Sequence, residues 1–239
     1  MKSPIRILVH GASGRMGRAL LRLASEDARF DVVAAASRSG EASADISVPV
    51  FAAGHLPQCP PFDIAIDFSL PEGFDTLLAE CLARGAGLVS GTTGLGDHQR
   101  SKLSDAGKKI PVLWASNFSL GVVVLEELVR RASAALPLWP VDITETHHLH
   151  KKDAPSGTAL TLAQAAQQRG GSAPVIHSRR EGEVIGEHLV RFSGPGEVIE
   201  LSHRAGDRDI FARGALEAAA RLNDRPAGQW PLAGLILPG

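Results

Sequence analysis

Short apolar strands alternate with helical segments through the first half of this 239-residue chain. Strands that alternate with helices in this way form βαβ units, in which the strands are parallel and helices cover both faces of the sheet. The pattern therefore predicts a doubly wound parallel sheet. We expect its strands at 5–10, 31–37, 62–69, 87–94 and 110–118, and its helices at 18–24, 71–82 and 97–107.

The pattern changes near Ser119. Apolar residues recur at helical spacing from 119 to 135, and a strand is expected at 141–148. Two alternating runs flank Gly194-Pro195-Gly196, which is typical of an antiparallel hairpin. The second half therefore predicts a smaller α+β domain with an open mixed or antiparallel sheet, and the cleft between two domains is where a ligand is expected. Further helices are expected from Thr158 to Gln168, ending at Gly170-Gly171, and at 209–222.

Composition excludes several classes of function. Lys and Arg number 25 and Asp and Glu 26, so no global charge favours nucleic acid or a membrane surface. No apolar run approaches the length of about 20 residues that spans a bilayer, and the first residues do not resemble a signal peptide. Cys59 and Cys81 are far apart and unlike a disulfide framework. We expect a cytoplasmic protein with two ordinary thiols.

A glycine-rich turn, H-G-A-S-G-R-M-G, directly follows the first strand and opens the first helix. Its glycines have G-x-x-G-x-x-G spacing, not G-x-G-x-x-G. Glycines still allow a close backbone approach to a pyrophosphate, and a helix N-terminus offers N–H donors and partial positive charge. The alternative is a plain turn. Its position favours a dinucleotide site in a Rossmann-type domain.

The end of the second strand indicates which dinucleotide is bound. An acidic residue there would bind the ribose hydroxyls of NADH, but no carboxylate occurs before Glu41. Arg38, with Arg15, is suited to a 2′-phosphate. The sequence therefore predicts that NADPH is preferred and NADH is the alternative cofactor. If Arg38 were a solvated loop residue, this preference would not follow.

The stretch E-T-H-H-L-H-K-K-D-A-P-S-G-T-A-L at 145–160 concentrates groups that can do chemistry. His147 and His148 end a strand, Lys151 follows, and Ser156 is suited to cap the next helix. Lysine, serine and the backbone N–H groups of 157–158 form a carboxylate receptor, and a histidine beside it can exchange protons near neutral pH.

A metal site is the main alternative for these histidines. On a strand, His147 and His148 face opposite ways, so that only His148 and His150 share a face. No H-E-x-x-H or C-x-x-C motif accompanies them. We therefore expect no metal. Ser156 lacks the G-x-S-x-G elbow of a nucleophile, and His188 and His203 are assigned to the second domain's sheet.

The segment E-T-H-H-L-H-K-K-D-A-P-S-G-T-A resembles the signature of the bacterial dihydrodipicolinate reductase (4-hydroxy-tetrahydrodipicolinate reductase) family. Similar segments occur in the family's order along almost the whole chain. They are G-A-S-G-R-M-G, A-I-D-F-S-L-P-E-G, V-S-G-T-T-G, A-S-N-F-S-L-G-V, G-E-H-L-V-R-F and L-S-H-R-A-G-D-R-D-I-F-A-R-G-A.

The resemblance implies an NAD(P)H-dependent reductase of the diaminopimelate route to lysine, which transfers hydride to C4 of a cyclic dicarboxylate. It implies that His147 is the general acid, Lys151 a second proton donor or cationic stabiliser, and His148 a substrate contact. Ser156, Gly157 and Thr158 would hold a substrate carboxylate. The implied nucleotide contacts are Gly11, Ala12, Ser13, Gly14, Arg15 and Met16 at the pyrophosphate, and Gly91, Thr92, Thr93, Ala115, Ser116, Asn117 and Phe118 beside the nicotinamide.

The resemblance also implies the domain plan and the assembly. Residues 1–118 and 208–239 would form a discontinuous dinucleotide-binding domain, and 119–207 the substrate-binding and oligomerisation domain. The segment 178–186 is shorter than in the family, which is a departure in the sheet that builds the family's homotetramer. We expect a homo-oligomer, with the tetramer less firmly indicated by this shortened segment.

Two other functions remain open from the sequence. A related nicotinamide enzyme could act on a different amino-acid-derived substrate, although the histidine motif argues against it. A non-catalytic NAD(P)-sensing protein could share the fold, but it would be expected to lack His147 or Lys151, and both are present.

Overall fold

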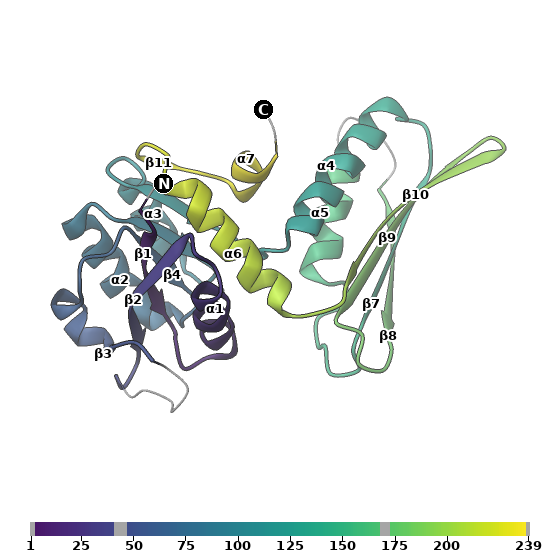
Figure 1. Ribbon diagram of the computed structural model, residues 1–239. Helices are drawn as coiled ribbons and strands as arrows, with labels where there is room; N and C mark the ends of the chain where they lie inside the picture. Colours follow the sequence, from purple (N-terminus) through teal and green to yellow (C-terminus); the bar gives the residue numbers. More distant parts are fainter. Residues whose placement is uncertain (1–2, 41–46, 168–172, 238–239) are drawn as a thin grey trace. The chain divides into compact units, whose positions relative to one another are not determined.

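The computed structural model describes residues 3–40, 47–167 and 173–237. The chain divides into two compact units. One comprises Met1–Phe118 and Asp209–Gly239, and the other Ser119–Arg208 (Figure 1). The expected acidic position Glu41 and the expected helix end at Gly170-Gly171 lie outside the described residues.

The first unit is built on a seven-stranded parallel sheet with the order β11-β6-β5-β4-β1-β2-β3. The chain starts in the middle, at β1, and extends first to one side and then to the other, so a topological switch point lies between β1 and β4. The strands are β1 (Ile5–His10), β2 (Phe30–Ser37), β3 (Val50–Ala52), β4 (Ile64–Asp67), β5 (Gly87–Ser90), β6 (Pro111–Trp114) and β11 (Gly228–Gln229).

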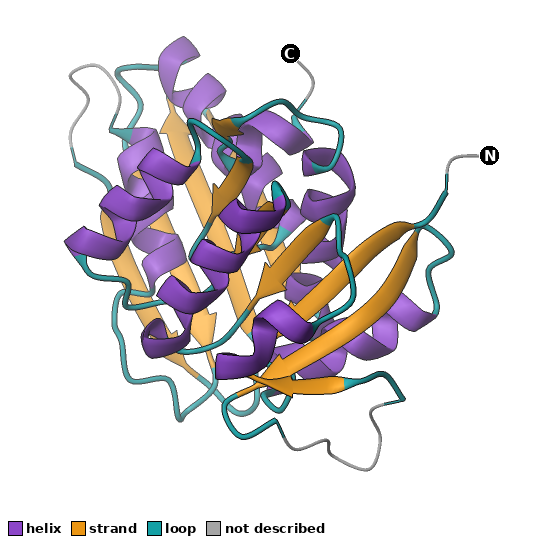
Figure 2. Ribbon diagram, turned by 90° about the vertical axis from the view of Figure 1, so that its left-hand side faces the viewer, coloured by secondary structure: helices purple, strands orange, loops and turns teal. Residues whose placement is uncertain are grey.

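Helices cover both faces of this sheet (Figure 2). The helices α1 (Arg15–Ser25) and α6 (Asp209–Leu222) contact each other, as do α2 (Pro71–Arg84) and α3 (Asp97–Ala106). Leu8 packs with Phe74 and Leu77 of α2 in one core, whereas its strand neighbours Ile7 and Val9 point to the opposite face and are also buried. Burial of both strand faces explains why the strands read as continuous apolar runs.

Two glycines of the β1–α1 turn are required by close backbone contacts. Gly11 has φ +82°, and a Cβ there would lie 2.4 Å from the carbonyl oxygen of Phe68. A Cβ on Gly17 would lie 2.3 Å from the carbonyl oxygen of Gly11. These positions therefore accept only glycine, which holds α1 tightly against the strand ends.

The second unit has a four-stranded sheet with the order β10-β9-β7-β8. The strands β7 (Val141–His147) and β8 (Val175–Arg180) are parallel, and the other neighbouring pairs are antiparallel, so the sheet is mixed as expected. The hairpin of β9 (Gly186–Gly194) and β10 (Glu197–Ala205) is confirmed.

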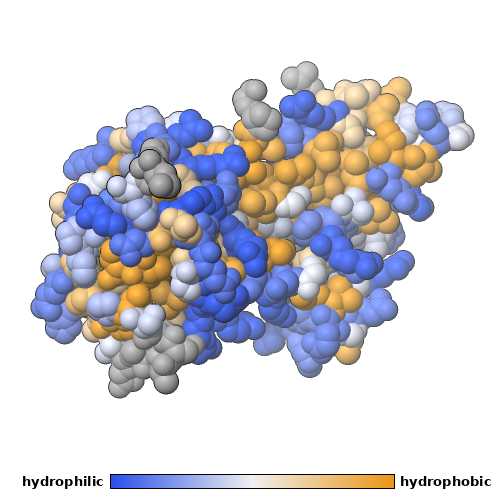
Figure 3. Space-filling view, viewed as in Figure 1, coloured by the Kyte–Doolittle hydropathy of each residue, from blue (hydrophilic) through white to orange (hydrophobic). Residues whose placement is uncertain are grey.

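Two helices pack on this second sheet, α4 (Leu120–Ala135) and α5 (Gly157–Ala166). The core between them joins Leu125 and Val129 of α4, Leu162 of α5, and Val190 and Phe192 of β9. Apolar residues also gather on the outer surface in the region of α4, where Val124 and Leu128 are exposed (Figure 3).

Several short elements were not expected from the sequence: β3, β8, β11, the 3-10 helix η1 (Ala53–Gln58) and α7 (Leu232–Ile236). The strand β8 reads V-I-H-S-R-R and exposes most of its residues at the edge of its sheet, so it carries no alternating apolar signal.

Candidate active site

The candidate nucleotide site of the first unit lies where its parallel strands end. The loops that follow β1, β2 and β4 surround a cavity of about 480 Å³. This is the carboxyl edge of the sheet at the switch point, where doubly wound folds bind ligands. The cavity is lined by His10, Gly11, Ser13, Gly14, Ser37, Arg38, Ala53, Phe68, Ser69, Leu70, Glu72 and Gly73. The glycine-rich turn and Arg38 are thus brought together.

The helix that starts beside this cavity is suited to hold an anion. The helix α1 begins at Arg15, directly after Gly14, and its first turn contains no acidic residue. The buried Ala12 is fixed by its N–H, which donates to the carbonyl of Ala36 at 3.0 Å. Ser13, Gly14 and Arg15 are exposed beside the helix N-terminus, whose partial positive charge favours phosphate.

A buried carboxylate organises the loops at the switch point. Asp67 ends β4 and is fully buried, and its oxygens bind the Nδ1 of His10 and the hydroxyls of Ser90 and Thr92, each at 2.8 Å. Burial raises the pKa of Asp67, but the hydrogen bonds from His10, Ser69 and Thr92 outweigh burial and lower it. Asp67 therefore remains an anion that fixes three neighbouring strand ends.

The loops assigned to the nicotinamide end follow β5 and β6 in the same unit. Thr92 is buried, and its carbonyl accepts from Nε1 of Trp114 at 2.8 Å, whereas Thr93 is exposed. A Cβ on Gly91 would lie 2.2 Å from the ring of Phe68. The centroid of that ring lies 5.4 Å from the centroid of the Phe118 ring. The remaining positions of this segment, Ala115, Ser116 and Asn117, lie between Trp114 and Phe118, and the N–H of Ala115 donates to Ser90 at 3.1 Å.

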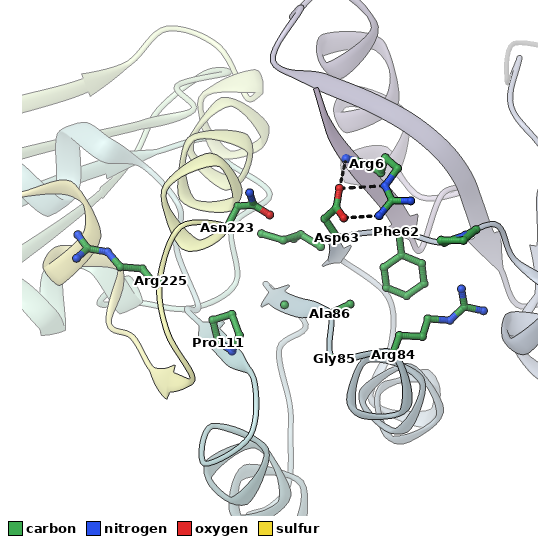
Figure 4. Close-up of a pocket in the computed structure, with 12 residues that line it drawn as sticks. Arg6, Phe62, Asp63, Arg84, Gly85, Ala86, Pro111, Asn223 and Arg225 are labelled. Atoms are coloured by element: carbon green, nitrogen blue, oxygen red, sulfur yellow. Dashed lines mark hydrogen bonds and ion pairs between the residues drawn. The ribbon is translucent and has the colours of Figure 1, made fainter. Parts of the chain in front are cut away.

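A second cavity of the first unit, about 560 Å³, opens at the opposite edge, where the strands begin (Figure 4). Its three arginines already have partners, and Arg225 stacks on the ring of Trp230 at 4.9 Å from the centroid. Arg6 pairs with Asp63, and Arg84 donates to the carbonyls of Leu56, Pro57, Cys59 and Pro60. This cavity is remote from the glycine-rich turn, and we do not assign it to the nucleotide.

In the second unit, the expected general acid His147 is buried at the end of β7. Its Nδ1 is hydrogen-bonded to the carboxylate of Glu145, two residues earlier on the same face of the strand. Burial lowers the pKa of His147, and the carboxylate of Glu145 opposes this effect without cancelling it. With Nδ1 held by Glu145, Nε2 is the ring atom left for proton exchange, and a Cβ on Gly186 would crowd it at 3.1 Å.

Lys151 lies on the loop that follows β7. Its Nζ forms an ion pair with Asp153 at 2.9 Å, and its side chain is 22% exposed. Arg180, at the end of β8, reaches the same loop and donates to the backbone carbonyls of Lys151 and Asp153. The structure therefore brings His147 and Lys151 into one hydrogen-bonded assembly.

The residues expected to hold a substrate carboxylate lie at the start of α5. Ser156 is the N-cap residue, and its Oγ accepts from the N–H of Ala159 at 3.2 Å. Gly157 is exposed and Thr158 half-buried in the first turn. His188 approaches from β9, with its Nε2 3.4 Å from Oγ of Ser156 and its ring centroid 5.2 Å from that of His147. Burial lowers the pKa of His188 to about 4, so its ring is neutral at neutral pH.

The other two histidines of the 145–160 stretch lie outside this buried group, whereas the ring of His203 on β10 lies 6.3 Å from that of His188 between centroids. His148 is half-buried and His150 exposed after the end of β7, with ring centroids 6.3 Å apart. Over the described ranges 3–40, 47–167 and 173–237, no group of three or more His, Cys, Asp or Glu side chains could hold a metal ion. Over these same ranges, no helix is long and apolar enough to cross a membrane.

Sequence reasoning missed four residues of these sites: Asp67, Glu145, Arg180 and His188. The i, i+2 spacing of Glu145 and His147 on a strand was a usable signal, because it places both side chains on one face. Arg180 gave no signal, because the strand that carries it was not expected.

Comparisons with known proteins agree along the whole chain. The family model described as "Dihydrodipicolinate reductase, N-terminus" matches residues 5–118, and "Dihydrodipicolinate reductase, C-terminus" matches 121–235. The chain is 59% identical over 237 residues to 4-hydroxy-tetrahydrodipicolinate reductase of Stenotrophomonas maltophilia (strain R551-3), covering 98% of this chain and 99% of that protein. It is 57% identical over 236 residues to the protein of the same name from Xanthomonas campestris pv. campestris (strain B100), with coverage of 98% and 99%.

Solved structures show the same likeness. Dipicolinate-bound dihydrodipicolinate reductase from Paenisporosarcina sp. TG-14 superposes with a TM-score of 0.81 at 25% identity, covering 95% of this chain and 97% of that chain. The DAP dehydrogenase of C. glutamicum in complex with DAP has a TM-score of 0.62 at 15% identity, covering 100% of this chain and 97% of that chain, and shares the fold.

Proposed function

This chain belongs to the dihydrodipicolinate reductase family, and we propose on that premise that it reduces 4-hydroxy-tetrahydrodipicolinate to tetrahydrodipicolinate with NAD(P)H, in the diaminopimelate route to lysine. The observation that carries the assignment is the assembly at the end of β7. A buried Glu145–His147 pair, the ammonium of Lys151 and the N-terminus of α5 lie within one short stretch of chain and its neighbours.

The roles of these residues follow from the charge changes of the reaction. When bound, the reduced nicotinamide supplies the hydride. The 4-hydroxyl group of the substrate leaves as water, which gives a conjugated imine. Hydride addition to C4 of this imine then leaves negative charge on the ring system, which a proton donor or a cation must neutralise. We assign proton donation to Nε2 of His147, because Glu145 holds Nδ1 and so fixes the orientation of the ring. Lys151 serves as the second proton donor or as the cation that stabilises this charge.

A dicarboxylate substrate needs fixed donors at its carboxylates. The helix N-terminus at Ser156, Gly157 and Thr158 supplies backbone donors and partial positive charge, and these favour one carboxylate. His148 is assigned a further substrate contact. Ser156 also caps the helix, so its side chain fixes the position of the first turn that does the binding.

The nucleotide is assigned to the first unit, with residues 11–16 at the pyrophosphate and 91–93 and 115–118 at the nicotinamide. NADPH is proposed as the preferred form. Ser37 and Arg38 line the same cavity as the glycine-rich turn, and a guanidinium there can bind the 2′-phosphate by charge-assisted hydrogen bonds.

The second unit is assigned to substrate binding and to assembly as a homo-oligomer. Its helices α4 and α5 form a core with the sheet, and apolar residues such as Val175 and Val198 nevertheless remain exposed on the strands. Sedimentation of the purified protein tests this assignment, and a monomer at micromolar concentration would reject it.

The activity itself is tested by generating the unstable substrate in place. The preceding synthase is supplied with its substrates, this protein is added, and the oxidation of NADPH and of NADH is followed separately by absorbance. We expect oxidation that depends on both proteins and is faster with NADPH. Absence of oxidation with either nucleotide would reject the proposed reaction.

A further inference from the structure

Arg180 lies beside both expected proton donors of the second unit, at the end of β8. It is the last residue of β8, in register with His147 at the end of the parallel strand β7. Its side chain is 19% exposed. Each nitrogen of its guanidinium donates to a group at the end of β7 or β8, or in the loop that carries Lys151.

One set of these bonds reaches the carboxylate behind His147. Nη1 of Arg180 lies 3.0 Å from Oε1 of Glu145, and the other oxygen of Glu145 binds Nδ1 of His147. Glu145 is fully buried, so an unpaired charge there would be costly. Arg180 compensates the charge of the carboxylate at one oxygen, and the other oxygen holds the imidazole ring of His147 in one orientation.

The other set reaches the loop that carries the lysine. Nη2 of Arg180 donates to the carbonyl of Asp153 at 2.5 Å, and Nε to the carbonyl of Lys151 at 3.3 Å. The carboxylate of Asp153 pairs with Nζ of Lys151. The guanidinium therefore fixes the loop backbone on both sides of residue 152, along with the pair that orients the ammonium.

We propose that Arg180 is a positioning residue that fixes the spacing between the two proton-donating groups, His147 and Lys151, by binding Glu145 and the Lys151–Asp153 loop with one rigid guanidinium. This inference rests on the proposed function. A lysine cannot replace it, because a single ammonium does not present donors in the fixed planar fork that these separated acceptors require. Arg180 itself touches neither substrate nor cofactor in this assignment.

The connection from β8 to β9 supports the same arrangement. The N–H of Glu181 donates to the carbonyl of His147 at 2.8 Å, and the N–H of Leu149 donates to the carbonyl of Gly182 at 3.2 Å. These two bonds join the connection to the end of β7 and to the loop that carries Lys151, which is the same loop that Arg180 binds.

The test compares Arg180→Ala and Arg180→Lys with the wild type in the coupled assay. For each protein, kcat, the KM for substrate and the Kd for NADPH are measured. The matched control is Arg179→Ala, which removes an exposed arginine from the preceding position and leaves its carbonyl in place as an acceptor for Arg180. Turnover by the wild type tests the proposed function. The ratio of the kcat of each variant to the kcat of the wild type tests the role of Arg180.

We expect Arg180→Ala to lose about 100-fold in kcat, the size of effect that misplacement of reacting groups by about 1 Å produces. The Kd of this variant for NADPH should stay within about twofold of the wild-type value. Residue 180 lies in the second unit, whereas the glycine-rich turn belongs to the first. Millimolar guanidinium chloride should restore part of kcat, and sodium chloride at the same ionic strength should not. Arg179→Ala should match the wild type.

Three results would overturn the proposal. They are a kcat near that of the wild type in Arg180→Ala, a loss of kcat that guanidinium does not restore, and a loss of equal size in Arg179→Ala. If Arg180→Ala does not fold, Arg180→Lys decides, because it keeps a positive charge beside Glu145. A folded Arg180→Lys with normal NADPH affinity and at least a tenfold loss of kcat supports the positioning role, and one with normal kcat rejects it.

Discussion

Nδ1 of His10 lies 2.8 Å from a carboxylate oxygen of Asp67, and both side chains are buried where β1 and β4 run in register. This pair sits at the switch point of the seven-stranded sheet, the position from which the nucleotide-binding loops diverge. Because Asp67 also binds the hydroxyls of Ser90 and Thr92, one carboxylate links the ends of β1, β4 and β5. The geometry of the proposed nucleotide site therefore depends on a residue that is itself inaccessible to the nucleotide.

Replacing this carboxylate should weaken both the fold and nucleotide binding. Asp67→Ala leaves buried donors without their acceptor, which costs about 3–5 kcal/mol in comparable buried pairs. We expect a lower Tm and a higher Kd for NADPH, measured by thermal unfolding and by nucleotide fluorescence. The control is Asp63→Ala, which breaks the exposed ion pair with Arg6 at the other end of β4 and should cost at most about 1 kcal/mol. Equal losses in the two variants would show that the Asp67 network has no special role.

The carboxylate of Glu145 should set the pH range over which the enzyme turns over. It raises the pKa of His147, opposing burial and the charges of Lys151 and Arg180. Removing it in Glu145→Gln therefore lowers the pKa of His147. A general acid acts in its protonated form, so kcat falls as the pH rises above the pKa of His147. In Glu145→Gln this fall in kcat should occur at lower pH than in the wild type. The measurement is kcat against pH, with Glu127→Gln on the surface of α4 as control. If the pH at which kcat falls is the same in Glu145→Gln as in the wild type, or higher, the role of Glu145 is contradicted.

The nucleotide preference should reside in Arg38. A charge-assisted hydrogen bond contributes about 1.5–3 kcal/mol, so Arg38→Ala should lose roughly 10-fold to 100-fold in kcat/KM with NADPH. The value with NADH, which has no 2′-phosphate, should stay within about twofold. Steady-state kinetics with both nucleotides checks this, and Arg131→Ala, an exposed arginine on α4, serves as control. Parallel losses with the two nucleotides would mean that Arg38 does not read the 2′-phosphate.

His188 should make the protein sensitive to acid. Its pKa in the folded protein is about 4, below its ordinary value of 6.5, so between these pH values the unfolded chain binds a proton that the folded chain does not. The free energy of unfolding should therefore fall as pH falls through this window, by about 3 kcal/mol in total. His188→Gln removes this contribution, and its Tm should depend less on pH from 6.5 to 4. Identical pH dependence in both proteins would reject the assignment.

Local signals predicted the secondary structure of the 145–160 stretch and of the glycine-rich turn well. The strand ending at His147, the N-cap at Ser156 and the glycine-rich turn each combine residue type with spacing, and the structure places each where the pattern indicates. The five central strands of the first unit's sheet were likewise predicted, because strands buried on both faces leave continuous apolar runs, whereas the short edge strands β3 and β11 were not.

Residues whose role depends on distant partners could not be predicted in this way. Asp67 looks like any acid at a strand end, and its role depends on hydroxyls more than twenty residues away. Arg180 depends on β8, an exposed edge strand without alternation, being paired with β7. Such contacts are fixed by tertiary structure, and no local periodicity encodes them.

The central claim is that His147 donates the proton that accompanies hydride transfer, and kcat of His147→Gln measured alongside the Kd for NADPH tests it most directly. Removal of a general acid costs about 10²–10⁴-fold in rate. We predict a loss of kcat in that range with the Kd for NADPH unchanged within about twofold, and the same pattern for Lys151→Ala. A kcat for His147→Gln close to that of the wild type, in a protein that binds NADPH normally, would contradict the account.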